Sequence, residues 1–119
     1  MIQVLIEVAN NTRANAHVPY SGYHVGAALL SESGIVFGGC NVENASYGLS
    51  ICAERTAYVK AVSEGEHEFV AIAVVTDDER IADAAYGLGL LVFIYWFGVI
   101  PAIRRGRQGP RYGLIVPLA

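Results

Sequence analysis

The chain has 119 residues, of which 54% are hydrophobic and 16% charged, where a typical domain has about 25% charged residues. That length predicts one domain over residues 1–119, and the composition excludes a disordered chain, a collagen-like repeat and a disulfide scaffold. The net charge of −3 favours neither nucleic acid nor an anionic membrane as a partner.

Charge is divided unevenly along the chain. Residues 1–83 hold four basic and all eleven acidic residues, a net charge of −7, whereas residues 84–119 hold four arginines and no acid. Two cysteines, Cys40 and Cys52, cannot form a disulfide framework. The first residues, MIQVLIEVANN, lack the basic region and cleavage pattern of a signal peptide, so we expect a cytoplasmic protein.

The N-terminal third predicts a helix followed by a hairpin. Apolar residues at helical spacing predict the helix over 2–15. Two runs of strand-forming residues, separated by a Ser-Gly turn, predict a hairpin of strands 23–30 and 35–42. Gly38 and Gly39 interrupt the second strand, which indicates either a bulge or the close approach of another group.

A second helix and a third strand follow. The helix is expected over 51–64, with Ser50 as its N-cap and Gly65 as its C-terminal stop. The near-continuous apolar run 69–76 (FVAIAVVT) predicts a strand buried on both faces. The order helix, strand, strand, helix, strand indicates an α/β layer fold.

Residues 84–103 (AAYGLGLLVFIYWFGVIPAI) contain no charge. Twenty residues in a helix rise about 30 Å, enough to cross a bilayer. Acidic residues before the run and arginines after it resemble the flanks of a membrane anchor. A buried helix or strand pair, interrupted by glycines and a proline, is the preferred interpretation; a tail that does not pack normally is a further alternative.

Cys52 and Glu54 stand at the predicted start of the second helix. The helix N-terminus is expected to lower the pKa of Cys52 and so to favour a thiolate, which is a nucleophile or a metal ligand. A metal-bound water beside a carboxylate is suited to hydrolytic attack. Taken alone, C-A-E is a very weak signal, and a half-buried cysteine beside a first-turn glutamate that suits the helix dipole is its preferred explanation.

The surroundings of C-A-E carry a more specific signal. Four blocks occur in order: 19–29 (PYSGYHVGAAL), 39–48 (GCNVENASYG), 52–57 (CAERTA) and 60–65 (KAVSEG). Together they closely resemble the small, homotetrameric, zinc-dependent cytidine deaminases, from the first helix to about residue 76. C-A-E in place of H-A-E favours the free-nucleoside branch over the tRNA- and mRNA-editing branches.

This resemblance implies a fold and a reaction. The expected fold is an α/β three-layer α-β-α sandwich with a mixed β-sheet. The expected reaction is the hydrolytic deamination of cytidine or deoxycytidine to uridine or deoxyuridine and ammonia, in pyrimidine salvage. The implied cofactor is zinc, and the implied assembly is a homotetramer that binds a small nucleoside.

The resemblance also assigns catalytic roles. Cys52 is similar to the first zinc ligand of the family, and Glu54 to the proton shuttle that activates the zinc-bound water, as in zinc deaminases generally. Arg55 matches the arginine that offsets the thiolate charge near the zinc.

Substrate contacts are implied in the same way. Asn41 and Glu43 match the pair that hydrogen-bonds the ribose 3′-hydroxyl, since an amide and a carboxylate together can donate to and accept from one hydroxyl. Tyr23 stands where the family has a phenylalanine against the base, and the Ala53 backbone lies beside the pyrimidine. Tyr47 belongs to a loop that in the family reaches a neighbouring subunit's site.

Each of these residues has a simpler interpretation. Asn41 and Asn44 can make local turn hydrogen bonds, Tyr23 can be an ordinary strand aromatic, and Arg55 a solvated helix residue. Four more residues match no ligand position: Cys40, expected as a small buried strand residue, and the surface or half-buried histidines His17, His24 and His67.

The resemblance breaks at the zinc site. The family completes it with P-C-x-x-C at the start of the next helix, but no cysteine follows Cys52. The matching positions fall on Tyr86 and Gly89, or on Gly87 and Leu90, and none of these side chains is a normal zinc ligand. A diverged C-terminus, a recombined one or a coding-sequence error would each produce this break.

A catalytic zinc needs three protein ligands and a water. We therefore predict an empty zinc site and an inactive or severely impaired deaminase, unless Cys40, a histidine or one of Asp77, Asp78 and Asp83 supplies the missing ligands. A nucleoside-binding or oligomerising pseudoenzyme is the second hypothesis, and a protein anchored in the membrane through residues 84–103 is the third.

Overall fold

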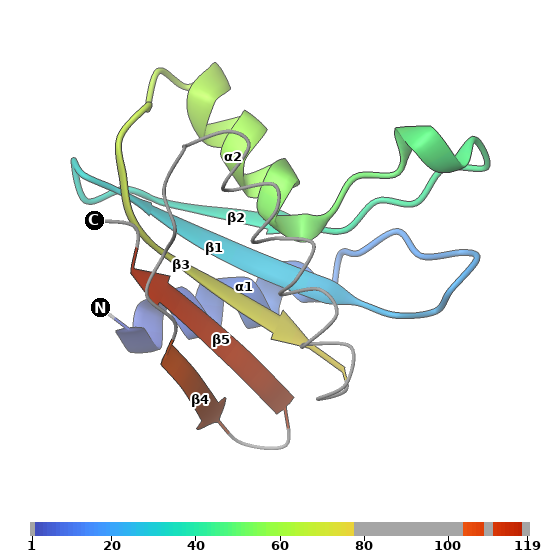
Figure 1. Ribbon diagram of the computed structural model, residues 1–119, viewed down its shortest axis with the longest axis horizontal. Coiled ribbons are helices and arrows are strands. Elements are labelled where there is room, and N and C mark those ends of the chain that lie inside the picture. Colours follow the sequence, from blue (N-terminus) through green and yellow to red (C-terminus); the bar gives the residue numbers. More distant parts are fainter. Residues whose placement is uncertain (1, 78–103, 109–110, 118–119) are drawn as a thin grey trace.

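The computed structural model describes residues 2–77, 104–108 and 111–117. Its elements follow in the order α1 (Ile2–Arg13), β1 (Val25–Ser31), β2 (Val36–Cys40), the 3-10 helix η1 (Tyr47–Leu49), α2 (Ala53–Ser63), β3 (Phe69–Thr76), β4 (Arg104–Gln108) and β5 (Arg111–Pro117). The five strands form one sheet in the order β2-β1-β3-β5-β4 (Figure 1). The two helices and three strands predicted in the first 76 residues are confirmed.

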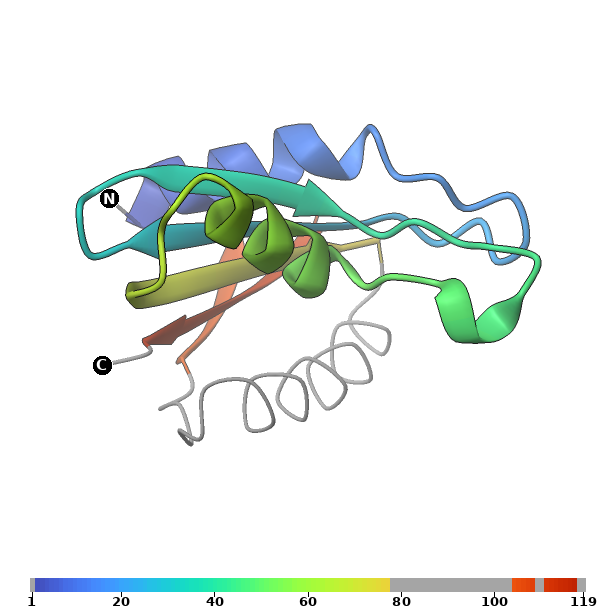
Figure 2. The ribbon, with the colours of Figure 1, turned by 90° about the horizontal axis from the view of Figure 1, so that it is seen from above.

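The two helices cover opposite faces of the sheet (Figure 2). Successive side chains of β3 alternate between two apolar clusters, with Ala73 and Val75 packed with α1 and Ile72 and Val74 packed with α2. Strand geometry produces this alternation, because consecutive side chains point to opposite faces. The apolar run of β3 is thus buried on both faces, and the expected three-layer α/β sandwich is confirmed.

The expectation of a mixed sheet is corrected. Each of the four ladders among the described strands is antiparallel: β1 with β2, β1 with β3, β3 with β5, and β4 with β5. The unit β2-α2-β3 does run in parallel, as a strand–helix–strand crossover requires. However, β1 lies between β2 and β3 and is antiparallel to both, so the parallel pair never shares a ladder.

Glycines let both helices approach the sheet closely. A Cβ added to Gly39 on β2 would lie 2.6 Å from the carbonyl oxygen of Ala53 and 2.9 Å from the Cα of Ala57, both on α2. On the other face, a Cβ added to Gly26 of β1 would overlap the carbonyl oxygen of Ala9 and lie 2.8 Å from the nitrogen of Arg13. The glycines of β2 therefore mark a close approach, and the ladder between β1 and β2 keeps its register there.

The start of α2 differs from the prediction. The N-cap is Cys52, whose side chain makes no capping hydrogen bond, and not Ser50. The Ser50 hydroxyl instead accepts the Asn44 N–H at 3.0 Å. Ile51 is held in an antiparallel bridge with Val42, so the chain stays extended until Cys52. At the other end, Gly65 follows the C-cap with a φ of +92°, and its predicted role as the stop is confirmed.

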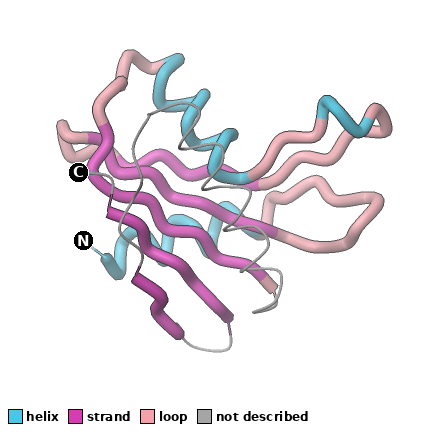
Figure 3. Tube along the Cα trace, in the orientation of Figure 1, coloured by secondary structure: helices cyan, strands magenta, loops and turns pink. Residues whose placement is uncertain are grey.

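Two long loops, 14–24 and 41–52, project from the same end of the sandwich (Figure 3). We call these two loops, together with the first turn of α2 and Asp77, the loop end. The apolar run 84–103, on which the membrane hypothesis rests, lies outside the described residues. Among the residues that are described, no helix is long and apolar enough to span a bilayer.

Candidate active site

Backbone hydrogen bonds bring the two loops to the start of α2. The His17 N–H donates to the Asn41 carbonyl at 3.0 Å, and the Glu43 N–H donates to the His17 carbonyl at 2.8 Å. On the other side, Val42 and Ile51 exchange a pair of hydrogen bonds of 2.9 and 2.8 Å. The segment 41–43 thus lies between loop 14–24 and the residue preceding Cys52, as a shared site requires.

Asn41 ties this segment to the beginning of β1. Its Oδ1 accepts the Val25 N–H at 2.9 Å, and its Nδ2 donates to the Tyr23 carbonyl at 2.9 Å. These are not the local turn hydrogen bonds of the simpler interpretation, because the two partners lie 16 and 18 residues away in the sequence. An amide has two N–H donors and two acceptor lone pairs, so half of that capacity remains for a ligand.

Glu43 holds the tip of the neighbouring loop. Its Oε1 accepts the backbone N–H groups of Tyr20 and Ser21, each at 3.1 Å. Hydrogen bonds from the Ser21 side chain and backbone hold the pKa of Glu43 below its ordinary value, since they favour the charged form. A carboxylate offers about four lone-pair sites, so Glu43 can still accept a further hydroxyl.

The pKa prediction for Cys52 is wrong. Burial, together with the nearby Glu54 carboxylate, raises the pKa of this thiol to about 11. The helix N-terminus, which favours the thiolate, is outweighed because desolvation and a neighbouring negative charge both disfavour it. Without a bound cation, Cys52 is therefore a thiol at neutral pH.

Glu54 is the most unusual side chain of the loop end. It is only 2% exposed, and neither of its carboxylate oxygens has a hydrogen-bond partner among the described residues. Burial raises its pKa to about 7. A carboxyl group poised near neutrality both accepts and releases protons, which is the property required of a general acid–base group.

The described residues do not fit a zinc centre. Both cysteines and all three histidines of the chain lie within the described ranges. In those ranges, no three histidine, cysteine, aspartate or glutamate side chains come together as a metal site. Cys52 therefore supplies one donor where a catalytic zinc needs three. Asp78 and Asp83, named above as substitute ligands, lie outside the described residues.

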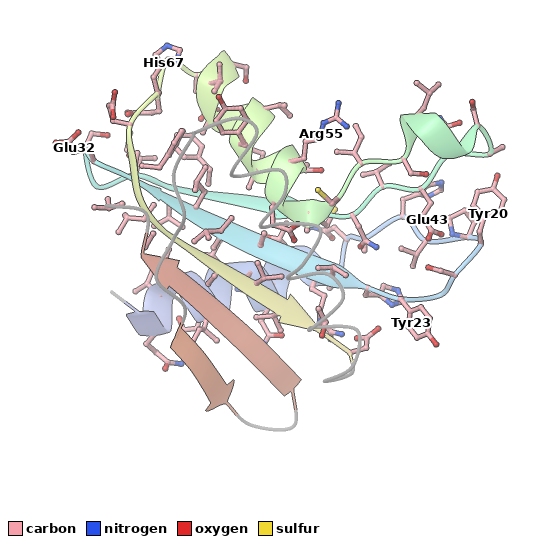
Figure 4. The ribbon with its side chains drawn as sticks, in the orientation of Figure 1. Tyr20, Tyr23, Glu32, Glu43, Arg55 and His67 are labelled. Atoms are coloured by element: carbon pink, nitrogen blue, oxygen red, sulfur yellow. The ribbon has the colours of Figure 1, made fainter. Side chains whose placement is uncertain are left out.

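The remaining predicted residues are distributed around the loop end. Ala53 is fully buried as the first residue of α2, and Tyr23 is 51% exposed. Arg55 is exposed, and its side chain extends away from the sheet (Figure 4). Tyr47 begins η1 in the projecting loop. The contacts predicted for these four residues with base, zinc and neighbouring subunit stay predictions.

The four residues considered as non-ligands lie on β2, in loop 14–24 and between α2 and β3. Cys40 is the last residue of β2 and is half-buried. Burial raises its pKa, an effect that the nearby Lys60 opposes. His17 and His67 are exposed and His24 is half-buried, as predicted. His67 lies at the far end of the sandwich from Glu43 (Figure 4).

Sequence reasoning missed the structural role of Asp77. This residue forms an ion pair with Arg13 and accepts the His24 N–H at 3.0 Å. It was named only as a possible zinc ligand, and these contacts give it another role. An aspartate directly after a buried strand was the available signal, but nothing local indicates partners on α1 and before β1.

Comparison with known proteins identifies the family. The model of the cytidine and deoxycytidylate deaminase zinc-binding region matches residues 1–85. The chain belongs to this family. The cytidine deaminase of Halalkalibacterium halodurans is 59% identical over 78 residues, which cover 66% of this chain and 59% of that protein. The probable cytidine deaminase of Dictyostelium discoideum is 55% identical over 76 residues, 64% of this chain and 52% of that protein.

Solved structures agree with the fold. A cytidine deaminase from Burkholderia pseudomallei superposes with a TM-score of 0.75 and 39% identity, over 95% of this chain and 91% of that one. A cytidine deaminase from Mycobacterium tuberculosis superposes with a TM-score of 0.68 and 35% identity, over 82% of this chain and 78% of that one. The sequence matches, in contrast, cover little more than half of the curated relatives.

Proposed function

We propose that the chain binds cytidine or deoxycytidine, and that its deamination of them to uridine or deoxyuridine and ammonia is severely impaired. One observation carries the proposal: the segment holding Asn41 and Glu43 is bonded to the chain just before Cys52 and Glu54. Groups suited to a sugar and groups suited to proton transfer thus lie on adjoining segments. Membership of the family supports the choice of a cytosine nucleoside.

The ribose contact uses the hydrogen-bonding groups of Asn41 and Glu43 that the loop does not occupy. The second N–H of Asn41 donates to the 3′-hydroxyl, and Glu43 accepts the hydroxyl proton. Because backbone amides already hold both side chains in place, binding requires little further ordering of them. Tyr23 contributes an exposed aromatic ring for the base.

Glu54 moves the protons of the reaction. Hydrolysis adds the oxygen of water to C4 of the base and releases the amino group as ammonia. Glu54 takes one proton from that water and passes it to the ring nitrogen of the base. It then takes the second proton from the hydroxyl formed at C4 and passes it to the amino group, which leaves as ammonia. A pKa of about 7 is suited to this cycle.

The first step limits the rate in this chain. A water that no cation activates has a pKa near 15.7, far above that of Glu54. In the described residues, no three histidine, cysteine, aspartate or glutamate side chains come together to hold a cation. We therefore expect the nucleoside to bind and turnover to be slow or absent.

Turnover and binding, measured separately, test this proposal. Loss of cytidine and deoxycytidine absorbance is followed with and without added zinc, and binding is measured by calorimetry with the same nucleosides. We expect binding that Glu43→Ala weakens, with little or no turnover. Turnover near that of an intact family member would disprove the impairment, and no binding at millimolar nucleoside would disprove the function.

A non-catalytic nucleoside-binding or oligomerising protein is the second candidate. The absence of a three-donor metal cluster in the described residues favours it. It predicts cytidine binding with a Glu54→Gln variant whose turnover equals that of the wild type. Measurable turnover that Glu54→Gln abolishes would favour the impaired enzyme instead.

The setting of this activity is part of the same proposal. By family, it belongs to pyrimidine salvage in the cytoplasm, within a homotetramer in which Tyr47 reaches a neighbouring site. Sedimentation of the purified chain with and without cytidine tests the assembly. A monomer under both conditions would contradict it.

A further inference from the structure

Three segments meet at Asp77, the residue that follows β3. Arg13 ends α1, and its Nη1 forms an ion pair with Asp77 Oδ1. His24 immediately precedes β1, and its backbone N–H donates to Asp77 Oδ2 at 3.0 Å. The His24 ring nitrogen Nδ1 lies 3.3 Å from the same oxygen. One carboxylate oxygen of Asp77 thus binds α1 through Arg13, and the other accepts a hydrogen bond from loop 14–24.

The burial of these groups differs. The Arg13 side chain is 10% exposed, whereas that of Asp77 is 32% exposed and that of His24 is 41% exposed. The ion pair ties Asp77 to the end of α1, where Arg13 packs closely over Gly26 of β1. Asp77 therefore presents Oδ2 to the loop from a fixed position.

Loop 18–24 has few other attachments. Tyr20 and Tyr23 are 65% and 51% exposed, so their rings add little packing. Gly22 adopts a φ of +71°, a conformation that favours glycine. The loop is held through its backbone. Glu43 accepts two N–H groups at the tip, and Asp77 accepts the N–H of His24. Asn41 donates to the carbonyl of Tyr23.

Asp77 differs from the other two anchors in one respect. Asn41 and Glu43 are the proposed ribose contacts, so their replacement removes both a ligand contact and a loop contact. Asp77 has no proposed contact with the nucleoside. Its effect on binding must therefore pass through the backbone of Tyr23 and His24.

We propose that Asp77 is a positioning residue for the nucleoside site: it fixes the Tyr23–His24 end of the loop to the sheet, and thereby sets the position of the Tyr23 ring. The ligand part of this inference rests on the proposed function. The anchor itself does not, since it is present without any ligand.

A pair of double variants separates positioning from stability. Arg13→Met with Asp77→Asn, and Arg13→Met with Asp77→Ala, both remove the charged pair. Only the asparagine keeps an oxygen that accepts the His24 N–H. Glu7→Ala, on the exposed side of α1, is the control for the loss of an acid. The two readouts are the exchange rate of the His24 amide and the Kd for cytidine.

We expect the alanine double variant to exchange the His24 amide roughly tenfold faster than the asparagine one, and to bind cytidine roughly three- to tenfold more weakly. The asparagine variant should restore both values toward the wild type. Equal exchange and equal Kd in the two variants would overturn the proposal. If the alanine variant does not fold, a His24 amide that exchanges in the wild type as fast as exposed loop amides overturns it as well.

The two proposals fail separately. If the wild type binds no nucleoside, the proposed function fails, and the exchange of the His24 amide still decides whether Asp77 anchors the loop. If the wild type binds cytidine and the two double variants bind it equally, the positioning role fails while the proposed function stands.

Discussion

Each helix buries one ionisable side chain at the loop end, and the two side chains differ in their partners. Arg13, at the end of α1, is 9% exposed and pairs with Asp77. Glu54, in the first turn of α2, is 2% exposed, and neither of its oxygens has a partner among the described residues. A paired buried charge can be structural, whereas an unpaired one costs stability and marks a site where chemistry is expected.

The largest effect on stability should come from breaking the ion pair between Arg13 and Asp77. Asp77→Ala leaves the Arg13 guanidinium buried without this carboxylate, which we expect to lower the free energy of unfolding by about 3 kcal/mol. Urea unfolding measures it. Glu7→Ala, which removes an exposed acid from the same helix, should change stability by less than about 0.5 kcal/mol. Equal effects of the two substitutions would show that the ion pair contributes nothing.

The contribution of the unpaired Glu54 to stability should depend on pH. The folded pKa of Glu54 is raised from 4.5 to about 7, so its protonated form is favoured by folding. Its contribution is then fully present below pH 4.5 and is lost as pH rises to about 7. Relative to Glu54→Gln, the metal-free wild type should lose about 2 to 3 kcal/mol over this range.

Unfolding curves of the two metal-free proteins, taken at several pH values, measure the difference directly. Above pH 7 it should be constant, and the glutamine variant should be the more stable of the two. A difference that does not change with pH would mean that the Glu54 carboxylate is solvated in the folded chain. In that case the contrast with Arg13 would disappear.

Both helices lie over a glycine of the sheet, and this similarity can be tested. Gly26→Ala under Arg13 and Gly39→Ala under Ala53 each place a methyl group against helix backbone. We expect each to destabilise the chain by about 2 kcal/mol, because the helix must move away from the sheet. Gly48→Ala, where the added methyl group meets nothing within 4 Å, is the control.

The two glycine variants should differ in function. Gly39→Ala moves the start of α2 away from Asn41, so it should weaken cytidine binding beyond its effect on stability. Destabilisation of the same size as in Gly48→Ala would show that the sheet and helices adjust to the methyl group at no cost.

Local pattern predicted the elements of the first 76 residues. Apolar periodicity located α1, a continuous apolar run located β3, and the expected cap and stop residues located α2, whose end Gly65 marks through its positive φ. The ladder between β3 and β5 could not be predicted, because the pattern of a strand does not state which strand it pairs with. The antiparallel order of the sheet escaped for the same reason.

Parts of the site escaped because they depend on distant residues. The pKa of Cys52 was predicted from its helix position, but burial among other elements decides it. Asp77 contacts His24 across 53 residues of sequence, and no local pattern reports such a contact. The Asn41–Glu43 segment was predicted as a ribose contact from its resemblance to a known family. The structure joins this segment to the residue before Cys52, and the contact with ribose stays a prediction.

The smallest effect concerns Glu43, which is a third kind of carboxylate at the loop end. Like Asp77, it accepts hydrogen bonds from backbone N–H groups, here those of Tyr20 and Ser21. Unlike Asp77, it lies near the surface and forms no ion pair among the described residues. Its pKa is lowered from 4.5, so its contribution is present above pH 4.5 and is lost as pH falls through the folded pKa. The amide resonances of Tyr20 and Ser21 should therefore titrate with a midpoint below 4.5 in the wild type. They should show no such step in Glu43→Gln, with the thermal midpoint of unfolding almost unchanged. A midpoint at or above 4.5 would mean that these hydrogen bonds do not favour the charged form, and that the loop tip is held in another way.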